Sequence, residues 1–226
     1  MQIRETFERP PQAVVEQFRG LAAANVADAS NRMFAMHAHI SPMGRGKRLC
    51  GPALTVKTAM ADNLMFHKAL SIAQPGDVIV VDCCGDMNQS VCGDVMFRYA
   101  KSRGVAGFVI NGCIRDVDFL QEDEFPVYAM GVTPRGPYKS AVGEINFDIC
   151  CGGQVVHPGD IILGDEDGIT VIRKEDAETI LAKMPTILAK EQQMGEIILS
   201  GEWEQKSAIL LNANKQIKAA GFEIIK

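Results

Sequence analysis

The sequence predicts an α/β fold, a layered sandwich built on a mixed β-sheet. Two continuous apolar runs rich in β-branched residues, at 78–81 and 105–111, are typical of strands buried on both faces. Residues 77–131 alternate strand, helix, strand, short helix and strand, which predicts parallel pairing through crossover connections. Residues 145–173 carry short strands separated by turns without helices, which indicates antiparallel pairing.

The individual elements follow from periodicity and from turn formers. Apolar spacing of three and four residues marks helices, and Gly, Pro and Asn mark the turns between elements. We therefore expect two helices within residues 11–36, a loop at 40–50, a strand at 53–58, a helix at 62–72, a strand at 78–81, a loop at 84–90, a helix at 91–103, a strand at 105–111, a turn at 112–116, a short helix at 117–122 and a strand at 126–131.

The C-terminal part of the chain, from residue 174 onward, is predicted to be mainly helical. Residues 174–200 predict a helix broken at Pro185, because proline lacks the N–H that a helix interior needs. Residues 206–220 predict a last helix or a mobile arm. We expect one domain over residues 1–200, which holds the functional site, and a C-terminal helical arm over residues 201–226.

Composition narrows the class of protein. The chain has 226 residues and a net charge of −5, and no block of like charges occurs, which argues against a nucleic-acid partner. Its seven cysteines include no C-x-x-C motif and lie mostly in apolar runs, as reduced buried thiols do. The start of the chain lacks the apolar core of a signal peptide, and no apolar run approaches a membrane span. A cytoplasmic protein without a membrane partner is expected.

The first candidate site lies at the end of the strand at 105–111. Polar residues crowd the following turn, Gly112–Asp116, and ligands of open α/β sheets bind beyond the carboxyl ends of the strands. The guanidinium of Arg115 suits a carboxylate in two-point contact, and Asp116 offers hard oxygen ligands for Mg²⁺ or Mn²⁺. The alternative is an Arg–Asp ion pair on the surface of a turn.

The second candidate site is the start of the helix at 91–103. A helix N-terminus presents free N–H groups and binds anions, and Gly93 would allow a ligand close to the backbone. Asp94 near that end could act on a proton through a water molecule. The alternative is that Asp94 is only a first-turn acid that suits the helix dipole. Both segments follow neighbouring strands, and together they favour chemistry that stabilises an enolate of a 2-oxo acid.

Other candidates are weaker. His37 and His39 could form a metal pair, but they lie in an expected loop without clear partners. Residues 44–48 resemble a phosphate loop without matching its pattern, and a solvated basic loop is the better interpretation. No glycine-rich nucleotide loop follows a strand, so a nucleotide cofactor is unsupported.

Three motifs carry a family resemblance: GDVIVVD at 76–82, VCGDVM at 91–96 and GFVINGCIRDVD at 107–118. They resemble the 4-hydroxy-4-methyl-2-oxoglutarate aldolases, also called the RraA-like family, from about Val26 to about Gly168. The resemblance implies an α/β sandwich of the swivelling β/β/α kind with added C-terminal helices. It also implies a homotrimer or homohexamer whose active site lies between subunits.

The activity that this resemblance implies is a class II, metal-dependent pyruvate aldolase. Such a lyase cleaves 4-hydroxy-4-methyl-2-oxoglutarate or 4-carboxy-4-hydroxy-2-oxoadipate to pyruvate and a second oxo acid, and decarboxylates oxaloacetate. By position, Arg115 would bind substrate oxygens, Asp116 would ligate Mg²⁺ or Mn²⁺, and Asp94 would orient a metal-bound water for proton transfer. The implied cradle for the pyruvyl group is the backbone of Gly93, Asp94, Val95 and Met96. Glu191 or Glu196 of a neighbouring subunit would complete the site.

Two alternatives remain open. The same family contains non-enzymatic inhibitors of ribonuclease E, which typically lack the metal-binding Asp and the long C-terminal helices. Asp116 and more than 40 residues after Arg173 favour the enzyme. The other alternative is a decarboxylase or hydratase of a different 2-oxo acid that uses the same enolate site.

Overall fold

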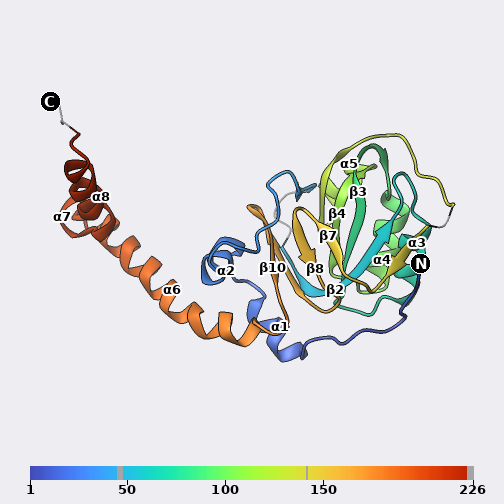
Figure 1. Cartoon of the computed structure of the whole chain (residues 1–226), viewed down its shortest axis with the longest axis horizontal. Coiled ribbons are helices and arrows are strands. Elements are labelled where there is room, and N and C mark those ends of the chain that lie inside the picture. Colours follow the sequence, from blue (N-terminus) through green and yellow to red (C-terminus); the bar gives the residue numbers. More distant parts are fainter. Residues whose placement is uncertain (45–47, 141, 223–226) are drawn as a thin grey trace. The chain divides into compact units, whose positions relative to one another are not determined.

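A computed structural model describes residues 1–44, 48–140 and 142–222 (Figure 1). Most of the basic loop expected at 44–48 therefore lies outside the described residues. The chain divides into two compact units, Met1–Ala182 and Lys183–Lys226, and the boundary falls within one helix.

The first unit is built on a mixed sheet with the strand order β1-β5-β4-β3-β2-β9-β10, and β6 also pairs with β2. The central four strands, β2 to β5, pair in parallel, and the strands around them pair antiparallel. The parallel pairing of β3, β4 and β5 and the antiparallel pairing of β9 and β10 confirm the prediction for residues 77–131 and 145–173. The strands are β1 (Ser41–Pro42), β2 (Leu49–Thr58), β3 (Val78–Ser90), β4 (Gly107–Ile114), β5 (Val127–Val132), β6 (Gly143–Ile145), β9 (Ile161–Asp165) and β10 (Gly168–Ile172), with a separate antiparallel hairpin of β7 (Ile149–Cys151) and β8 (Gln154–Val156).

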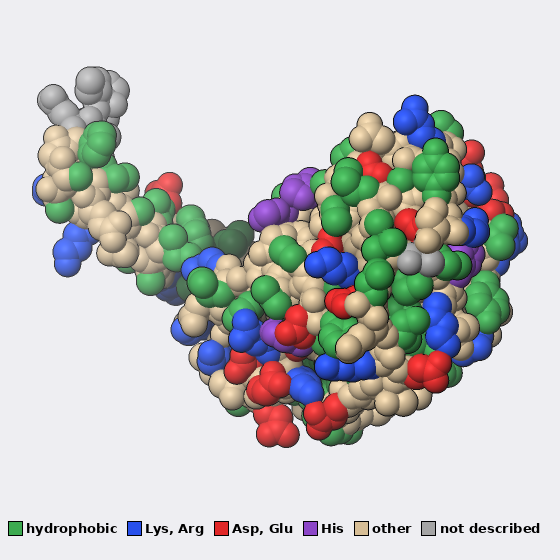
Figure 2. Space-filling view, turned by 45° about the vertical axis from the view of Figure 1, so that its right-hand side comes forward, with side chains coloured by type: hydrophobic (Ala, Val, Ile, Leu, Met, Phe, Trp, Pro, Cys, Tyr) green, Lys and Arg blue, Asp and Glu red, His purple; other side chains and the backbone are tan. Residues whose placement is uncertain are grey.

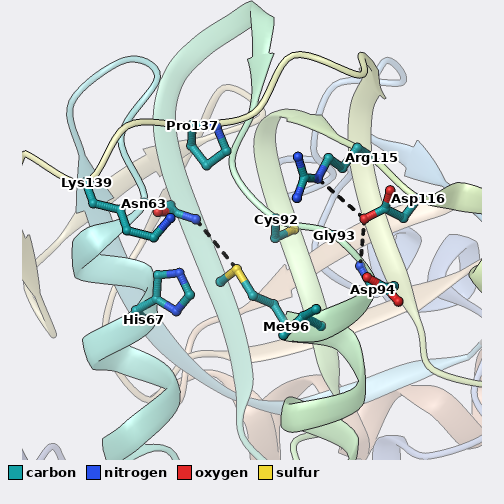
Figure 3. Close-up of a pocket in the computed structure, with 11 residues that line it drawn as sticks. Asn63, His67, Cys92, Gly93, Asp94, Met96, Arg115, Asp116, Pro137 and Lys139 are labelled. Atoms are coloured by element: carbon teal, nitrogen blue, oxygen red, sulfur yellow. Dashed lines mark hydrogen bonds and ion pairs between the residues drawn. The ribbon is translucent and has the colours of Figure 1, made fainter.

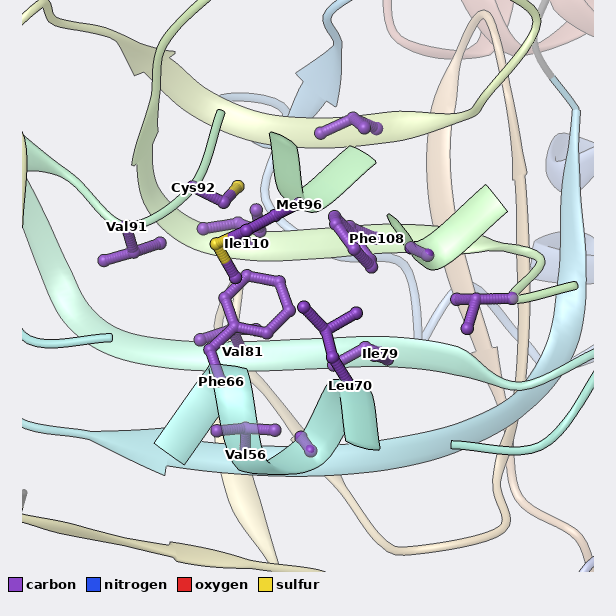
Figure 4. Packing of buried hydrophobic residues seen from close by; sticks show 14 of the residues in the cluster. Val56, Phe66, Leu70, Ile79, Val81, Val91, Cys92, Met96, Phe108 and Ile110 are labelled. Atoms are coloured by element: carbon purple, nitrogen blue, oxygen red, sulfur yellow. The ribbon is translucent and has the colours of Figure 1, made fainter. Parts of the chain in front are cut away.

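Both faces of the central strands are buried, because alternate side chains enter two different clusters. Ile79 and Val81 of β3 belong to the cluster beneath the helices (Figure 4), whereas Val78 and Val80 belong to the cluster with β9, β10 and the β7–β8 hairpin. Phe108 of β4 lies edge-on to Phe66 and to Phe125 in the first cluster. The sheet is therefore the middle layer between helices and β-structure.

Most helices match the predicted segments; α7 lies between two of them. Two short helices precede the sheet, three connect its parallel strands, and the remainder follow it. Their bounds are α1 (Gln12–Phe18), α2 (Ala23–Ala29), α3 (Leu64–Ile72), α4 (Asp94–Ser102), α5 (Val117–Glu122), α6 (Ala177–Leu199), α7 (Trp203–Lys206) and α8 (Ala208–Ala219). Within the described part of the chain, no helix is long and apolar enough to cross a membrane.

Three local predictions are wrong. The loop expected at 84–90 is a continuation of β3, which accommodates it through two register shifts against β4 and a positive φ at Cys84. Gly112, Cys113 and Ile114 belong to β4, so the turn begins only at Arg115. Helix α6 runs through Pro185 without a break, since the fixed φ of proline is helical and a single backbone hydrogen bond is lost.

Candidate active site

A pocket of about 200 Å³ lies at the carboxyl ends of the four parallel strands (Figure 3). The segment after each strand contributes to its lining: Asn63 and His67 after β2, Cys92 to Met96 after β3, Arg115 and Asp116 after β4, and Pro137 and Lys139 after β5. All six residues that the sequence predicts for the site, Gly93, Asp94, Val95, Met96, Arg115 and Asp116, line this one pocket.

The start of α4 forms one wall. Gly93 is the N-cap residue, in an extended conformation that any residue can adopt, so backbone strain does not explain the glycine. The surroundings of Gly93 explain why a glycine is needed, because a Cβ at this position would overlap Oδ2 of Asp116 and lie 3.0 Å from Cγ of Arg115. Met96 is buried, whereas the Val95 side chain is exposed. A ligand can therefore contact the backbone of this turn, and the exposed side chain of Val95 shields it little from solvent.

Asp116 stands at the junction of β4 and α5 with φ 60° and ψ 40°. This left-handed conformation is one that aspartate tolerates better than most residues. Oδ2 of Asp116 accepts a hydrogen bond from the main-chain N–H of Asp94, with 3.2 Å between N and O, and lies 3.4 Å from Nε of Arg115. Oδ1 has no partner among the described residues, so half of the carboxylate stays available to a ligand.

Arg115 is placed by its own backbone and by its neighbours. Its N–H donates to the carbonyl of Cys92 at 3.0 Å, which links the end of β4 to the segment before α4. A Cβ on Gly136 would lie 3.0 Å from Nη1 of Arg115, so the loop after β5 passes close to the guanidinium. The side chain remains 45% exposed, which leaves donors of its fork free for an anion.

Asp94 has a second contact, an ion pair with Arg98 one helical turn away, at 3.4 Å between Oδ2 and Nε. The ion pair that the sequence allowed as an alternative, Arg115 with Asp116, therefore exists, and the pair of Asp94 with Arg98 is an additional one. Arg115 and Asp116 both line the pocket, so an ion pair and a candidate ligand site coincide there, whereas Arg98 lies outside the lining. Such exposed pairs contribute little to stability by themselves.

Five pocket residues are not among the predicted site residues, and three of them carry side chains suited to binding a polar ligand: Asn63, His67 and Lys139 (Figure 3). Long-range backbone bonds bring them together, since Tyr138 donates to the carbonyl of Ala61 and Asn63 donates to that of Tyr138, at 2.7 and 3.1 Å. Nothing in the local sequence of either segment signals this pairing. Burial, and secondarily the charge of Lys139, lowers the pKa of His67.

The donor set fits a hard divalent cation with water in most of its positions. No group of three or more His, Cys, Asp or Glu side chains within the described residues is arranged to hold a metal ion. Mg²⁺ is commonly bound through one or two carboxylates while it keeps several waters. The open Oδ1 of Asp116, with Asp94 beside it, suits that mode of binding.

The weaker candidates lie elsewhere. The rings of His37 and His39 are 5.2 Å apart, and neither histidine lines the pocket at Arg115. On the face shown in Figure 2, acidic and basic side chains are interspersed over the first unit.

Comparisons with known proteins agree with this architecture. The family model "RraA-like: Aldolase/RraA" matches residues 23–171. A protein of Halalkalibacterium halodurans named "Putative 4-hydroxy-4-methyl-2-oxoglutarate aldolase" is 40% identical over 169 residues, 75% of this chain and 80% of that protein. An uncharacterized protein of Pseudomonas syringae pv. tomato superposes with a TM-score of 0.77 at 25% identity, covering 87% of this chain and 93% of its own.

A second solved structure has a different description. The RNA-processing inhibitor RraA from Thermus thermophilis superposes with a TM-score of 0.62 at 28% identity, covering 67% of this chain and 92% of its own. The matched region of the family model contains β2 to β5 and every pocket residue described above. The chain belongs to the RraA-like family.

Proposed function

We propose that this protein is a divalent-metal-dependent carbon–carbon lyase. Its substrate would be a 4-hydroxy-2-oxo diacid of the 4-hydroxy-4-methyl-2-oxoglutarate type, cleaved to pyruvate and a second oxo acid. The observation that carries the proposal is the placement of Arg115, Asp116 and the start of α4 around one pocket. The similarity to a protein named as an aldolase of this kind supports it.

In this proposal Arg115 and the backbone of α4 bind the pyruvyl end of the substrate. The guanidinium donates to the carboxylate and the 2-oxo oxygen, and the start of α4 adds the positive end of the helix dipole. A Mg²⁺ or Mn²⁺ ion held by Asp116 would supply further positive charge at these oxygens. Negative charge that develops on the 2-oxo oxygen is thereby stabilised.

Cleavage requires the 4-hydroxyl to lose its proton while the bond between C3 and C4 breaks. The electron pair of that bond remains with the pyruvyl half as an enolate, and C4 becomes a carbonyl. Asp94, with 38% of its side chain exposed at the pocket, would accept the hydroxyl proton through a water molecule and return one to C3. Oxaloacetate would lose CO₂ through the same enolate.

The assembly is part of the proposal. We expect a homotrimer or homohexamer in which Glu191 or Glu196 of a neighbouring copy completes the metal surroundings. Mass measurement in solution by light scattering checks the assembly. Glu191→Gln and Glu196→Gln, compared in metal titrations, identify which glutamate contributes.

A panel of 2-oxo acids with product identification tests the function. Release of pyruvate from 4-hydroxy-4-methyl-2-oxoglutarate supports the aldolase. Turnover of another 2-oxo acid alone would instead indicate a decarboxylase or hydratase.

A second candidate function rests on the structural similarity to an RNA-processing inhibitor. In that case the protein would bind a ribonuclease and would lack lyase activity. A pull-down with ribonuclease E at physiological salt, followed by an RNA cleavage assay, separates the two candidates.

A further inference from the structure

We propose that His37 and His39 form a second metal site, in which the two imidazoles together bind one divalent transition-metal ion of the Ni²⁺ or Zn²⁺ kind. Neither histidine lines the pocket at Arg115, so this site is separate from the candidate active site and does not depend on the proposed lyase function. Its protein ligands are nitrogen atoms, whereas the metal proposed at Asp116 has oxygen ligands.

A single β-turn carries both histidines. The N–H of Ile40 donates to the carbonyl of His37 at 3.0 Å, so His37 and His39 are the first and third residues of this turn. Met36 and Ile40, which flank the pair, are both buried in the cluster that contains Ile162 of β9 and the β7–β8 hairpin. The turn is therefore attached to the core at both ends, while the two histidines themselves are exposed.

The β7–β8 hairpin holds His37 in place. The N–H of His37 donates to the carbonyl of Gly152 at 2.8 Å, and a Cβ at Gly153 would overlap the His37 ring. Gly153 also has a φ of +77°, a conformation that favours glycine. The imidazole of His37 therefore packs directly against the main chain of the hairpin. This packing limits its rotation, and so it reduces the entropy that a bound ligand would cost.

The separation of the two rings matches ligation of one ion. Their centroids are 5.2 Å apart, and the ring planes meet at 62°. With metal–nitrogen bonds of about 2.1 Å, each centroid lies about 3.2 Å from the ion, and a tetrahedral angle between the ligands then separates the centroids by about 5 Å. The rings of His37 and His39 thus already have the spacing that shared ligation requires.

The ring nitrogens of the pair are available to a metal. Among the residues that the structure describes, neither imidazole forms a hydrogen bond or an ion pair. His157 is the contrast, because its Nδ1 lies 3.1 Å from the buried carboxylate of Asp160. Imidazole nitrogen suits Ni²⁺, Cu²⁺ and Zn²⁺, whereas Mg²⁺ prefers oxygen ligands. Two protein ligands leave the remaining positions of the ion to water.

Calorimetric titration with Ni²⁺ tests the site, with excess Mg²⁺ present to occupy oxygen ligands. The wild-type protein should bind one Ni²⁺ per chain at this site, and Ni²⁺ should raise its melting temperature. His39→Ala and His37→Phe should each weaken the binding at least about tenfold, because the remaining imidazole loses its chelating partner. Phenylalanine keeps an aromatic ring against Gly153 but has no nitrogen, so a loss in His37→Phe reports ligation and not packing.

Two kinds of control variant separate this pair from other groups that bind Ni²⁺. His157→Gln removes a histidine outside the pair, one that is already engaged with Asp160. Cys84→Ser and Cys150→Ser remove the two exposed thiols. All three variants should keep the Ni²⁺ affinity of the wild-type protein.

Absence of Ni²⁺ binding by the wild-type protein would overturn the site. So would wild-type affinity in either His39→Ala or His37→Phe, since an ion bound at Asp116 or at a thiol would persist in both. An equal loss in a control variant would also contradict the assignment to the pair. The titrations need no substrate, so a protein that binds Ni²⁺ as expected but releases no pyruvate would refute the proposed function and leave this site standing.

Discussion

The main-chain N–H of Asp94 donates to Oδ2 of Asp116, with 3.2 Å between the two atoms, and so joins the start of α4 to the end of β4. The same oxygen lies 3.4 Å from Nε of Arg115, an ion pair. One hydrogen bond and one ion pair therefore orient the carboxylate through one oxygen and leave Oδ1 open. This arrangement explains how one short turn can present a metal ligand and an anion-binding guanidinium side by side.

Asp116→Asn should separate charge from shape at this position. The amide keeps the size of the carboxylate and an oxygen for the N–H of Asp94, but it removes the negative charge that a divalent cation needs. We expect the Kd for Mg²⁺ to rise at least about tenfold, a loss of about 1.4 kcal/mol, and thermal stability to change little. Calorimetry and thermal melts measure the two effects; an unchanged Mg²⁺ affinity would remove Asp116 from the metal site.

Gly93→Ala should damage the site and not the backbone. The extended φ of −156° accommodates alanine, but the new Cβ would displace the side chains of Asp116 and Arg115. A shift of such groups by about 1 Å can lower activity by about a hundredfold. The matched control is Gly195→Ala in α6, where no atom lies within 4 Å of the added Cβ and helix propensity favours alanine. Equal activity of the two variants would show that the close approach of Gly93 to Asp116 does not affect activity.

The stability of the first unit should depend on the ion pair between Arg9 and Asp77. Asp77 is fully buried and accepts two hydrogen bonds from the guanidinium, both at 2.7 Å, while Arg9 is 22% exposed. Arg9→Ala leaves this carboxylate buried without its counter-charge, which costs about 3 kcal/mol. Arg19→Ala, which breaks an exposed pair with Glu16, should cost less than about 1 kcal/mol. Urea denaturation compares the two variants, and similar losses would contradict the difference in burial.

Thiol reactivity should divide the seven cysteines into two groups. Cys84 and Cys150 are exposed, and the other five are buried. Burial raises the pKa of Cys50 to about 11 and also raises the pKa of Cys83, Cys92, Cys113 and Cys151, which lowers their thiolate fraction. The pKa of Cys84 is raised too, by partial desolvation and by Asp82, but its thiol is accessible to a reagent. Ellman's reagent at pH 8 should modify two thiols rapidly, and all seven after unfolding. Rapid reaction of more than two in the native protein would contradict the packing around β3 and β4.

The layered fold could be predicted because its signals are local. Apolar runs such as 78–81 define strands that are covered on both faces, and each lies next to a helix of clear periodicity. The extension of β3 beyond Asp82 could not be predicted, since its polar residues pair with β4 only through bulges that no local pattern signals. Likewise Pro185 indicates a break by local rules, yet the surrounding helix continues through it.

The candidate site also has residues that the sequence predicts and residues that only the structure identifies. Gly93, Asp94, Arg115 and Asp116 lie in short motifs at strand ends, where ligand sites of parallel sheets are expected. Asn63, His67 and Lys139 lie in segments that meet through backbone bonds between residues more than 70 positions apart, such as Asn63 and Tyr138. Their sequence neighbours give no indication of that contact, so only the folded chain identifies them.

Pyruvate release from 4-hydroxy-4-methyl-2-oxoglutarate, followed by coupled reduction to lactate, tests the central claim most directly. For the wild-type protein, EDTA should abolish the release and added Mg²⁺ should restore it, whereas Asp116→Ala should remain inactive at saturating Mg²⁺. Failure of the wild-type protein to release pyruvate with any divalent metal, or full metal-dependent activity of Asp116→Ala, would contradict the account.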